Sequence, residues 1–288
     1  TQVTAAGGSH QTQEYAVRHG GQAGSMDYFV TGSYVDTAGY THNSDGTERD
    51  WTAANATANV GWQVGNDAEL RAQAGIFSGE GTDENSDRTA RKDYQALTWT
   101  QNNGLGRDGR LTARAYRNGE RNVYDWKYPG QGIYCQETVG GEVQQSLWAG
   151  ERNQLTAGVE GRDDRVDIDE VLNSINESTF TVGAYLQDEI RLTEAWRLTL
   201  GVRNDRNSDY DAAWSPRAGL LWKAFEGTEF YGSINRAYRA PSLSDRFVRT
   251  EYNGMLFEGN PDLDPEILTA FEVGMRSRIG KSVATELT

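Results

Sequence analysis

The chain has 288 residues, with 28 Lys and Arg against 42 Asp and Glu, so its formal net charge is −14. An acidic balance of this size argues against a nucleic-acid-binding protein, because such proteins carry basic surfaces. Only 36% of the residues are hydrophobic, and no run approaches the roughly 18 apolar residues of a membrane-spanning helix. These values exclude a helical membrane protein and leave open a transmembrane β-barrel, whose strands need an apolar residue only at every second position.

Apolar and polar residues alternate with a period of two along most of the chain. From Ala54 to Val64 every even-numbered residue is apolar and every odd-numbered residue is polar or glycine. Alternation of this kind predicts β-strands with one apolar face. In chain order we expect strands at 11–20, 25–36, 52–64, 68–78, 92–102, 110–119, 136–147, 154–164, 178–190, 196–205, 214–224, 228–236, 266–279 and from 283 onward.

The expected connections between these strands alternate between short and long. The long ones are 37–51, 79–91, 120–135, 165–177, 206–213 and 237–265. A soluble β-sandwich also alternates apolar and polar residues, but its Greek-key connections do not give a regular alternation of lengths. Short periplasmic turns and long external loops do, and strands of about 10 to 13 residues fit a tilted crossing of a bilayer. The sequence therefore predicts an all-β fold, an antiparallel transmembrane β-barrel.

The alternation also predicts which side chains face lipid and which line a water-filled lumen. Trp62, Trp196 and Trp222 have the apolar parity and lie near short turns, where an aromatic girdle is expected. The expected lipid-facing set includes Ala54, Val60, Leu70, Leu198 and Val202, and the expected lumen set includes Gln73, Arg114, Glu160 and Arg203.

Two neighbouring segments near the C-terminal end carry distinctive motifs. The first reads Tyr238-Arg239-Ala240-Pro241-Ser242, and the second reads Asn260-Pro261-Asp262-Leu263-Asp264-Pro265-Glu266. They resemble the two adjacent signatures of TonB-dependent outer-membrane receptors. The resemblance implies a barrel of about 22 strands around an N-terminal plug domain. Residues 1–288 are then expected to supply about 14 strands of that barrel domain and no plug.

The same resemblance implies a function in the bacterial outer membrane, among lipid and lipopolysaccharide. The expected function is import of a metal chelate, most simply a ferric siderophore whose Fe³⁺ is cargo, with coupling to TonB through the missing plug. Cobalamin or haem receptors of the same family and a passive porin are the alternatives. An enzyme is not expected, because His10, His19 and His42 are scattered near the N-terminus without an obvious Ser or Cys partner.

Two clusters are candidates for contact with the ligand. Guanidinium groups beside aromatic rings can hold an anionic, partly aromatic ligand by charge and stacking. Packing within the loops and contact with lipopolysaccharide are the alternatives, and Pro261 and Pro265 are expected to act through the backbone. The candidate residues are Tyr124, Trp126 and Tyr128 in one cluster and Arg236, Tyr238, Arg239, Arg246, Phe247, Arg249 and Tyr252 in the other.

A third cluster contains carboxylates at the expected start of an external loop. Oxygen ligands at this density can bind Ca²⁺, which would offset their mutual repulsion. Their spacing does not match an EF-hand loop, and a solvated acidic loop is the alternative. No other resident cofactor is expected. The four candidate ligands are Asp163, Asp164, Asp167 and Asp169.

Overall fold

The computed structural model describes residues 1–39, 46, 49–82, 86–126, 130–170, 173–252, 255–279 and 283–288. In this part of the chain, fifteen strands form one antiparallel sheet and two more form a separate hairpin. The elements are β1 (Gln2–Gly7), β2 (Gln13–Ala23), β3 (Met26–Thr37), β4 (Trp51–Val64), β5 (Ala68–Thr82), β6 (Ser86–Asn102), β7 (Arg107–Trp126), β8 (Gln131–Ala149), β9 (Asn153–Glu170), β10 (Asn173–Arg191), β11 (Trp196–Asn207), β12 (Ala213–Phe225), β13 (Thr228–Arg239), α1 (Leu243–Phe247), β14 (Arg249–Tyr252), β15 (Met255–Glu258), β16 (Glu266–Ile279) and β17 (Val283–Leu287). No helix in the described part of the chain is long and apolar enough to cross a membrane.

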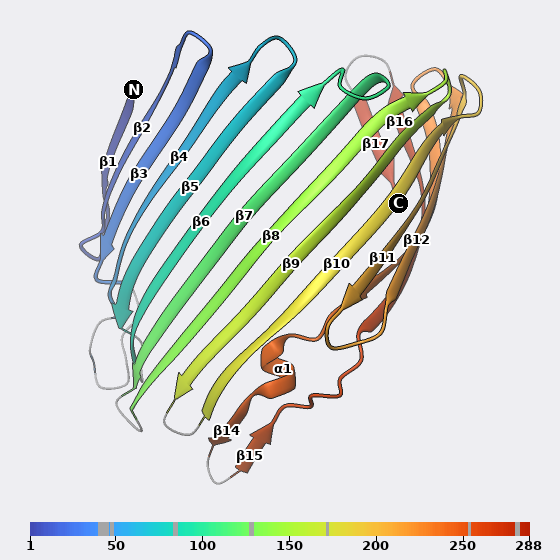
Figure 1. Ribbon diagram of the computed structural model, residues 1–288. Helices are drawn as coiled ribbons and strands as arrows, with labels where there is room; N and C mark the ends of the chain where they lie inside the picture. Colours follow the sequence, from blue (N-terminus) through green and yellow to red (C-terminus); the bar gives the residue numbers. More distant parts are fainter. Residues whose placement is uncertain are drawn as a thin grey trace.

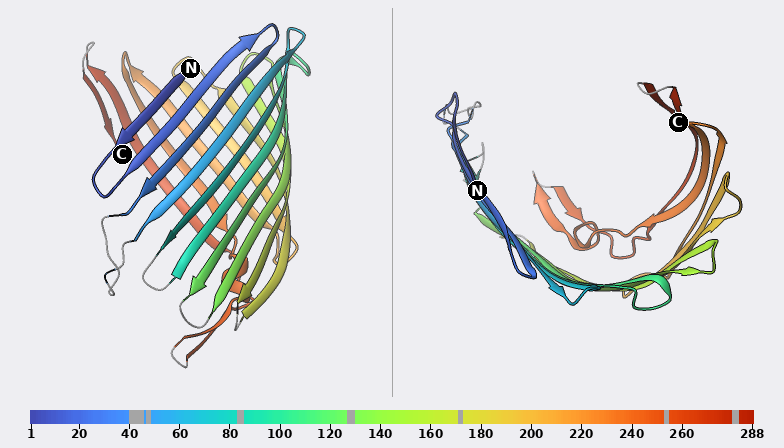
Figure 2. Two further views of the ribbon diagram at one scale, coloured as in Figure 1. Left: turned by 90° about the vertical axis from the view of Figure 1, so that its left-hand side faces the viewer. Right: turned by 90° about the horizontal axis from the view of Figure 1, so that it is seen from above.

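Each strand of the large sheet pairs with its neighbours in sequence, and the one jump is from β13 to β16. The segment 240–265 fills that jump and carries α1 and the β14–β15 hairpin. The sheet is tilted and curved like one half of a barrel, with β1 and β17 at its two edges (Figures 1 and 2). Seen from above, the segment 240–265 lies inside the curve (Figure 2). This segment, 240–265, contains most of the two motifs and is called the motif loop. It is therefore held on the concave side of the large sheet, which is called the wall.

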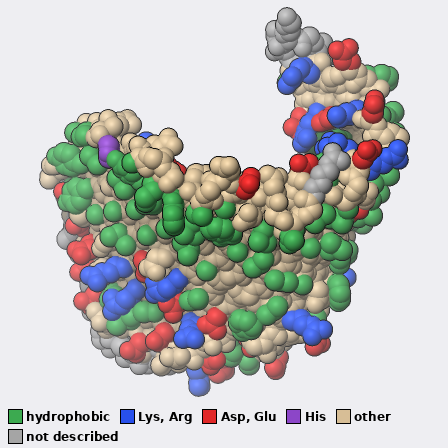
Figure 3. Space-filling view, turned by 45° about the horizontal axis from the view of Figure 1, so that its top comes forward, with side chains coloured by type: hydrophobic (Ala, Val, Ile, Leu, Met, Phe, Trp, Pro, Cys, Tyr) green, Lys and Arg blue, Asp and Glu red, His purple; other side chains and the backbone are tan. Residues whose placement is uncertain are grey.

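The convex face is apolar, as the alternation predicts. Val60 lies opposite Ala72 in the register, and Ala72 lies opposite Leu97. Strands β10 and β11 continue the same face, where Leu186 lies opposite Val202. In Figure 3, hydrophobic side chains cover the convex surface, and charged side chains gather below them, toward the end with the longer loops. All five residues expected to face lipid lie on this face: Ala54, Val60, Leu70, Leu198 and Val202.

Aromatic rings gather on the convex face near the short turns. Trp196 and Trp222 stack with ring centroids 5.2 Å apart, and Phe230 stacks on Trp222 at 5.6 Å. Trp62 is exposed on the same face, next to the turn between β4 and β5. The predicted girdle is present at this edge of the wall.

The concave face is polar and charged. Arg203 donates from Nη2 to Glu160 at 2.9 Å and to Asp205 at 2.6 Å, and Asp205 is 1% exposed. Tyr185 donates its hydroxyl to Glu142 at 2.7 Å. The residues expected in the lumen have this parity, namely Gln73, Arg114, Glu160 and Arg203.

Three long loops of the sequence prediction are mostly strand, and three strands were missed, namely β1 and the β14–β15 hairpin within the expected loop 237–265. The ranges 79–91, 120–135 and 165–177 extend β5 to β10 as paired ladders, and β1 (Gln2–Gly7) brings the sheet to fifteen strands rather than fourteen. The alternation of apolar and polar residues stops where the outward side chains of a strand cease to be apolar. Backbone hydrogen bonds between strands need no apolar side chain, so the pairing continues beyond that point. The pattern therefore predicts the apolar part of each strand and not its full length.

Candidate functional site

The first motif forms the N-terminus of a short helix. Ser242 is the N-cap of α1, and its hydroxyl accepts from the Asp245 backbone N–H at 3.0 Å. The Asp245 carboxylate accepts from the Ser242 N–H at 3.3 Å, which completes a capping box. Pro241 precedes the cap, where its fixed φ suits an extended residue. The Arg-Ala-Pro-Ser sequence thus ends β13 and turns the chain into α1.

Arg246 fastens this helix to two other segments. Its guanidinium forms an ion pair with Asp209, in the connection between β11 and β12, and Nε donates to the Pro261 carbonyl at 3.1 Å. Its Cζ lies 4.7 Å from the centre of the Phe247 ring. The Arg246 side chain is 9% exposed and that of Asp209 is 20% exposed. Arg246 is thus used inside the protein, which argues against the predicted ligand contact for this residue.

The start of the second motif and Gly259 before it dock through their backbone on the residues that follow the first motif, α1 and Val248. The Gly259 N–H donates to the Val248 carbonyl at 2.6 Å, and the Asn260 N–H donates to the Asp245 carbonyl at 3.1 Å. The Asn260 side chain then accepts from the Asp262 N–H at 3.0 Å, which turns the chain back toward β16. A Cβ on Gly259 would lie 2.6 Å from the Arg246 carbonyl carbon, so this approach requires glycine. Leu263 is exposed at the turn.

Pro265 directly precedes β16, whose first residue is Glu266, as expected for a residue that lacks a ladder donor.

The helix rests on an apolar floor provided by the concave wall. Val166 and Ile168 of β9 and Ile175 of β10 form a buried cluster with Leu243 of α1. Phe247, Val248 and Tyr134 pack against this cluster. Because Tyr134 comes from β8, the floor joins the helix to the aromatic cluster described next.

An aromatic cluster lies on the ends of β7 and β8, at the longer-loop edge of the concave face. The rings of Tyr124 and Trp126 stack at 5.8 Å, and Tyr134 meets both edge-on at 5.5 and 6.5 Å. The Arg88 guanidinium carbon lies 5.3 Å from the centre of the Tyr124 ring. Tyr128, predicted with them, lies outside the described residues.

Two adjoining cavities separate the motif loop from the wall. The smaller, of about 270 Å³, has Asp164, Tyr210 and Ser242 in its lining, and the larger, of about 420 Å³, has Glu160, Arg203 and Tyr238. Both are also lined by Arg162, Thr181 and Ala240. The Tyr210 ring meets Tyr238 at 6.3 Å. Burial and the neighbouring Tyr238 raise the pKa of Tyr210, so it is a neutral hydrogen-bonding group in the lining of the smaller cavity.

The other predicted ligand residues differ in exposure. Arg239 is 76% exposed, and its Nη1 lies 3.6 Å from Glu266. Arg249 is 64% exposed, and its Nε lies 3.4 Å from Glu258. Arg236 is exposed, and the Tyr252 side chain lies outside the described residues. Tyr238 and Phe247 take part in the packing of the motif loop, so Arg239 is the most accessible cation of the first motif.

The four carboxylates of the proposed Ca²⁺ site are not brought together. They lie in β9 and not at the start of a loop, so Asp163 and Asp164 project to opposite faces. Asp163 pairs with Arg165 at 2.8 Å, and Asp164 pairs with Arg162 at 2.7 Å. Asp167 and Asp169 are exposed and share the parity of Asp163. Among the described residues, no group of three or more His, Cys, Asp or Glu side chains is placed to hold a metal ion.

Sequence reasoning missed Asp209 and Arg88. Asp209 is 37 residues from Arg246 and lies in a connection that the sequence marks only as polar. Arg88 falls in the range 79–91, which the sequence reading assigned to a loop. With the register of β6 and β7 known, Arg88 stands directly opposite Tyr124.

A sequence model of the family described as "TonB dependent receptor-like, beta-barrel" matches residues 6–285. The iron-regulated outer membrane virulence protein of Vibrio cholerae is 25% identical over 305 residues, which cover 94% of this chain and 45% of that protein. The probable TonB-dependent siderophore receptor PirA of Acinetobacter baumannii is 29% identical over 105 residues, 32% of this chain and 14% of the relative. The vitamin B12 transporter BtuB of Vibrio vulnificus is 28% identical over 125 residues, 42% of this chain and 19% of the relative.

Solved structures show the same fold. A crystal structure of the siderophore receptor PirA from Acinetobacter baumannii superposes with a TM-score of 0.83 at 16% identity, covering 96% of this chain and 50% of that one. The chain thus spans about half the length of the proteins that it matches over nearly its whole extent.

Proposed function

Because the chain belongs to the β-barrel family of TonB-dependent receptors, which places it in the bacterial outer membrane, we propose that the full-length protein imports a ferric siderophore. The Fe³⁺ is then cargo and not a resident cofactor. Coupling to TonB belongs to the same proposal and requires segments of the full-length protein beyond these residues. Two relatives support an iron chelate by their names, one iron-regulated and one a probable siderophore receptor.

The observation that carries the proposal is the aromatic cluster of Tyr124, Trp126 and Tyr134, with Arg88 over one ring. It lies on the concave face at the edge with the longer loops, which in outer-membrane barrels is the extracellular edge. Ferric catecholates and ferric hydroxycarboxylates are both anionic. A catecholate also has flat aromatic rings. Stacking on Trp126 and charge from Arg88 and Arg239 match both properties.

A second candidate, cobalamin, is favoured by the similarity to BtuB. Cobalamin is close to neutral and gains little from Arg88 and Arg239, so the two ligands differ in how much they depend on these cations.

The test is fluorescence-quench binding of a ligand panel to the full-length receptor. The panel contains ferric catecholate, hydroxamate and hydroxycarboxylate siderophores, haem and cyanocobalamin. We expect Trp126→Ala and Arg239→Ala each to weaken siderophore binding by about fivefold or more. Arg278→Ala removes an exposed Arg from β16 near the short turns and is the matched control, with an unchanged affinity.

Binding of cyanocobalamin alone would overturn the siderophore assignment and leave the family intact. Equal siderophore affinity in the wild type, Trp126→Ala and Arg239→Ala would instead refute the location of the site. Open-channel conductance of the full-length protein without any bound ligand would favour a passive porin.

A further inference from the structure

Charges of opposite sign lie apart on the convex face of the wall. Arg91 of β6 lies directly opposite Arg121 of β7, and the same line of the register continues through Cys135 of β8 to Asp167 of β9. Residues directly opposite each other in a sheet project to the same face. Arg91 has the parity of Leu97, a residue of the apolar convex face, so all four side chains project outward, away from the lumen and the site described above.

The two arginines have no counter-charge within the described part of the chain. Both are exposed, and neither Arg91 nor Arg121 forms a hydrogen bond or ion pair there. Glu80 of β5 also projects outward, but it lies opposite Thr89, two residues beyond Arg91, and forms no ion pair with it. Like charges directly opposite each other repel and destabilise the pairing of their strands. The arginine pair is therefore an exposed cationic patch.

The opposite sign is found two strands away, on the outward side of β9. Asp163, Asp167 and Asp169 share the outward parity. Asp167 and Asp169 are exposed and form no ion pair among the described residues. Asp163 pairs with Arg165, whose side chain is 65% exposed. Three carboxylates and one guanidinium leave this side of β9 with a net negative charge.

A hollow of about 560 Å³, lined mainly by apolar residues, lies on the convex face beside these charges. Its floor follows one line of the register, from Ala115 of β7 through Gly141 of β8 to Gly161 of β9. Leu97 and Val182 border it at the two ends of that line. Small residues let two membrane-spanning elements approach closely. Strands β7 to β9 thus present a surface against which a second wall can pack.

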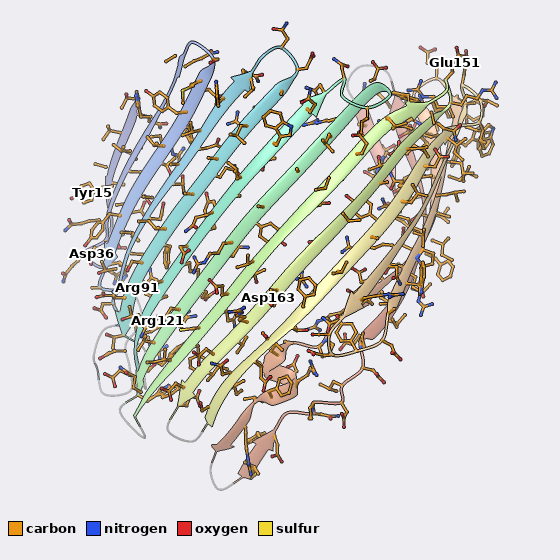
Figure 4. The ribbon with its side chains drawn as sticks, in the orientation of Figure 1. Tyr15, Asp36, Arg91, Arg121, Glu151 and Asp163 are labelled. Atoms are coloured by element: carbon orange, nitrogen blue, oxygen red, sulfur yellow. The ribbon has the colours of Figure 1, made fainter. Side chains whose placement is uncertain are left out.

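The two charged sets are placed for contact with a copy of the same chain. Two copies in one membrane share an orientation, so a twofold axis that relates them runs along the membrane normal. Such an axis brings the left half of one convex face against the right half of the other at the same height. In Figure 4, Arg91 and Arg121 lie to the left of Asp163 at similar heights. The arginines of each copy then meet the β9 carboxylates of the other.

We propose that the convex face from β6 to β10 is the interface of a homodimer in the outer membrane. The arginine pair of each copy binds the outward carboxylates of β9 in its partner, and the two hollows face each other between these contacts. A second copy matches both signs at once. An anionic lipid surface matches only the arginines and leaves the carboxylates without a partner.

The first test is crosslinking of the full-length receptor in isolated outer membranes with a short bis-maleimide. Cys135 is the one cysteine of residues 1–288, and it lies between the arginine pair and Asp167 in the register. We expect a crosslinked dimer that is absent in Cys135→Ser. Val202→Cys in the Cys135→Ser background is the collision control, because Val202 is exposed on the same face but lies on β11, outside the interface.

The second test is a charge swap with the same readout. Arg91→Glu combined with Arg121→Glu should lower the crosslinked fraction by about tenfold or more, since like charges then face each other across the interface. Addition of Asp163→Lys and Asp167→Lys to that chain should restore it, because the signs are complementary again. Arg110→Glu is the matched control, an exposed Arg of β7 with the lumen parity. Heat-modifiable gel mobility identifies the variants that form a folded barrel.

Three results from folded variants would overturn the proposal. One is crosslinking of the wild type no stronger than that of the collision control. Another is an unchanged crosslinked fraction after the double reversal, or an equal loss in Arg110→Glu. The third is a loss that the charge swap does not restore, which assigns the arginines to a lipid or to another protein.

Discussion

Removal of the Arg246 guanidinium should open the motif loop while leaving the wall intact. Arg246→Ala leaves the Asp209 carboxylate without its cation and the Pro261 carbonyl without its donor. Loss of one partner of a buried ion pair costs about 3–5 kcal/mol. Because Asp209 keeps 20% of its side chain exposed, we take the lower end, about 3 kcal/mol, which corresponds to roughly a 100-fold change in the opening equilibrium.

The assay is native-state hydrogen exchange of the full-length receptor. The amides of Gly259 and Asn260 are the reporters, because they donate to the carbonyls of Val248 and Asp245, and these hydrogen bonds break when the second motif separates from α1. Both should exchange about 100-fold faster in Arg246→Ala. Amides of β9 and β10 should be unchanged, because the ladder between them does not pass through the loop.

Arg249→Ala is the control, because it removes an ion pair of the same loop in which both side chains are more than 60% exposed. Exposed pairs contribute about 0–1 kcal/mol, so its effect should be at most about fivefold. If Arg246→Ala and Arg249→Ala accelerate the two amides equally, burial of the Arg246–Asp209 pair is not what holds the loop. A double-mutant cycle with Asp209→Ala adds a second criterion, since coupled neighbours should give a non-additive result.

Three further predictions follow from single positions. Gly259→Ala should destabilise the loop by about 1–3 kcal/mol through overlap with backbone atoms, measured by the same exchange assay, whereas Gly219→Ala meets no atom closer than 3.9 Å and should be neutral. Leu200→Arg should destabilise the barrel by about 2–4 kcal/mol in lipid-refolding titrations, and Thr199→Arg on the lumen face should have little effect. Burial raises the pKa of Asp209, but hydrogen bonds with Arg246, Thr179 and Ser208 and the charge of Arg246 outweigh it, so the pKa is below its ordinary value. Loop protection should therefore be constant above about pH 4 and decline as the pH falls below that value; a decline that begins near pH 6 would contradict this.

The sequence correctly predicts which side chains face each side of the sheet, but it underestimates the length of the strands. Period-two alternation reports a difference in environment between the two faces, and that difference exists only where one face is apolar. In β7 (Arg107–Trp126), the expected strand ends at Gly119, two residues after Arg117, the first charged residue of the outward face. The ladder beyond is fixed by hydrogen bonds between backbones, which leave no mark on side-chain type.

The candidate site shows the same limit in its long-range contacts. The capping box of Ser242 and Asp245 is local, so a motif can carry it. The ion pair of Arg246 with Asp209 joins segments 37 residues apart, and the contact of Arg88 with Tyr124 depends on the register of two strands. Neither follows from spacing along the chain.

Arg239 and Arg246 show why this limit affects experiments on the ligand. Arg239 lies in the first motif and Arg246 in α1 directly after it, and the sequence gives no reason to separate their roles. Burial separates them, since Arg246 is 9% exposed and bonded to two segments, while Arg239 is 76% exposed. Replacement of Arg246 would lower ligand affinity by opening the loop even if no ligand atom touched it. Arg239→Ala is therefore the variant that reports on ligand contact. Arg246→Ala reports on the packing that holds the loop in place.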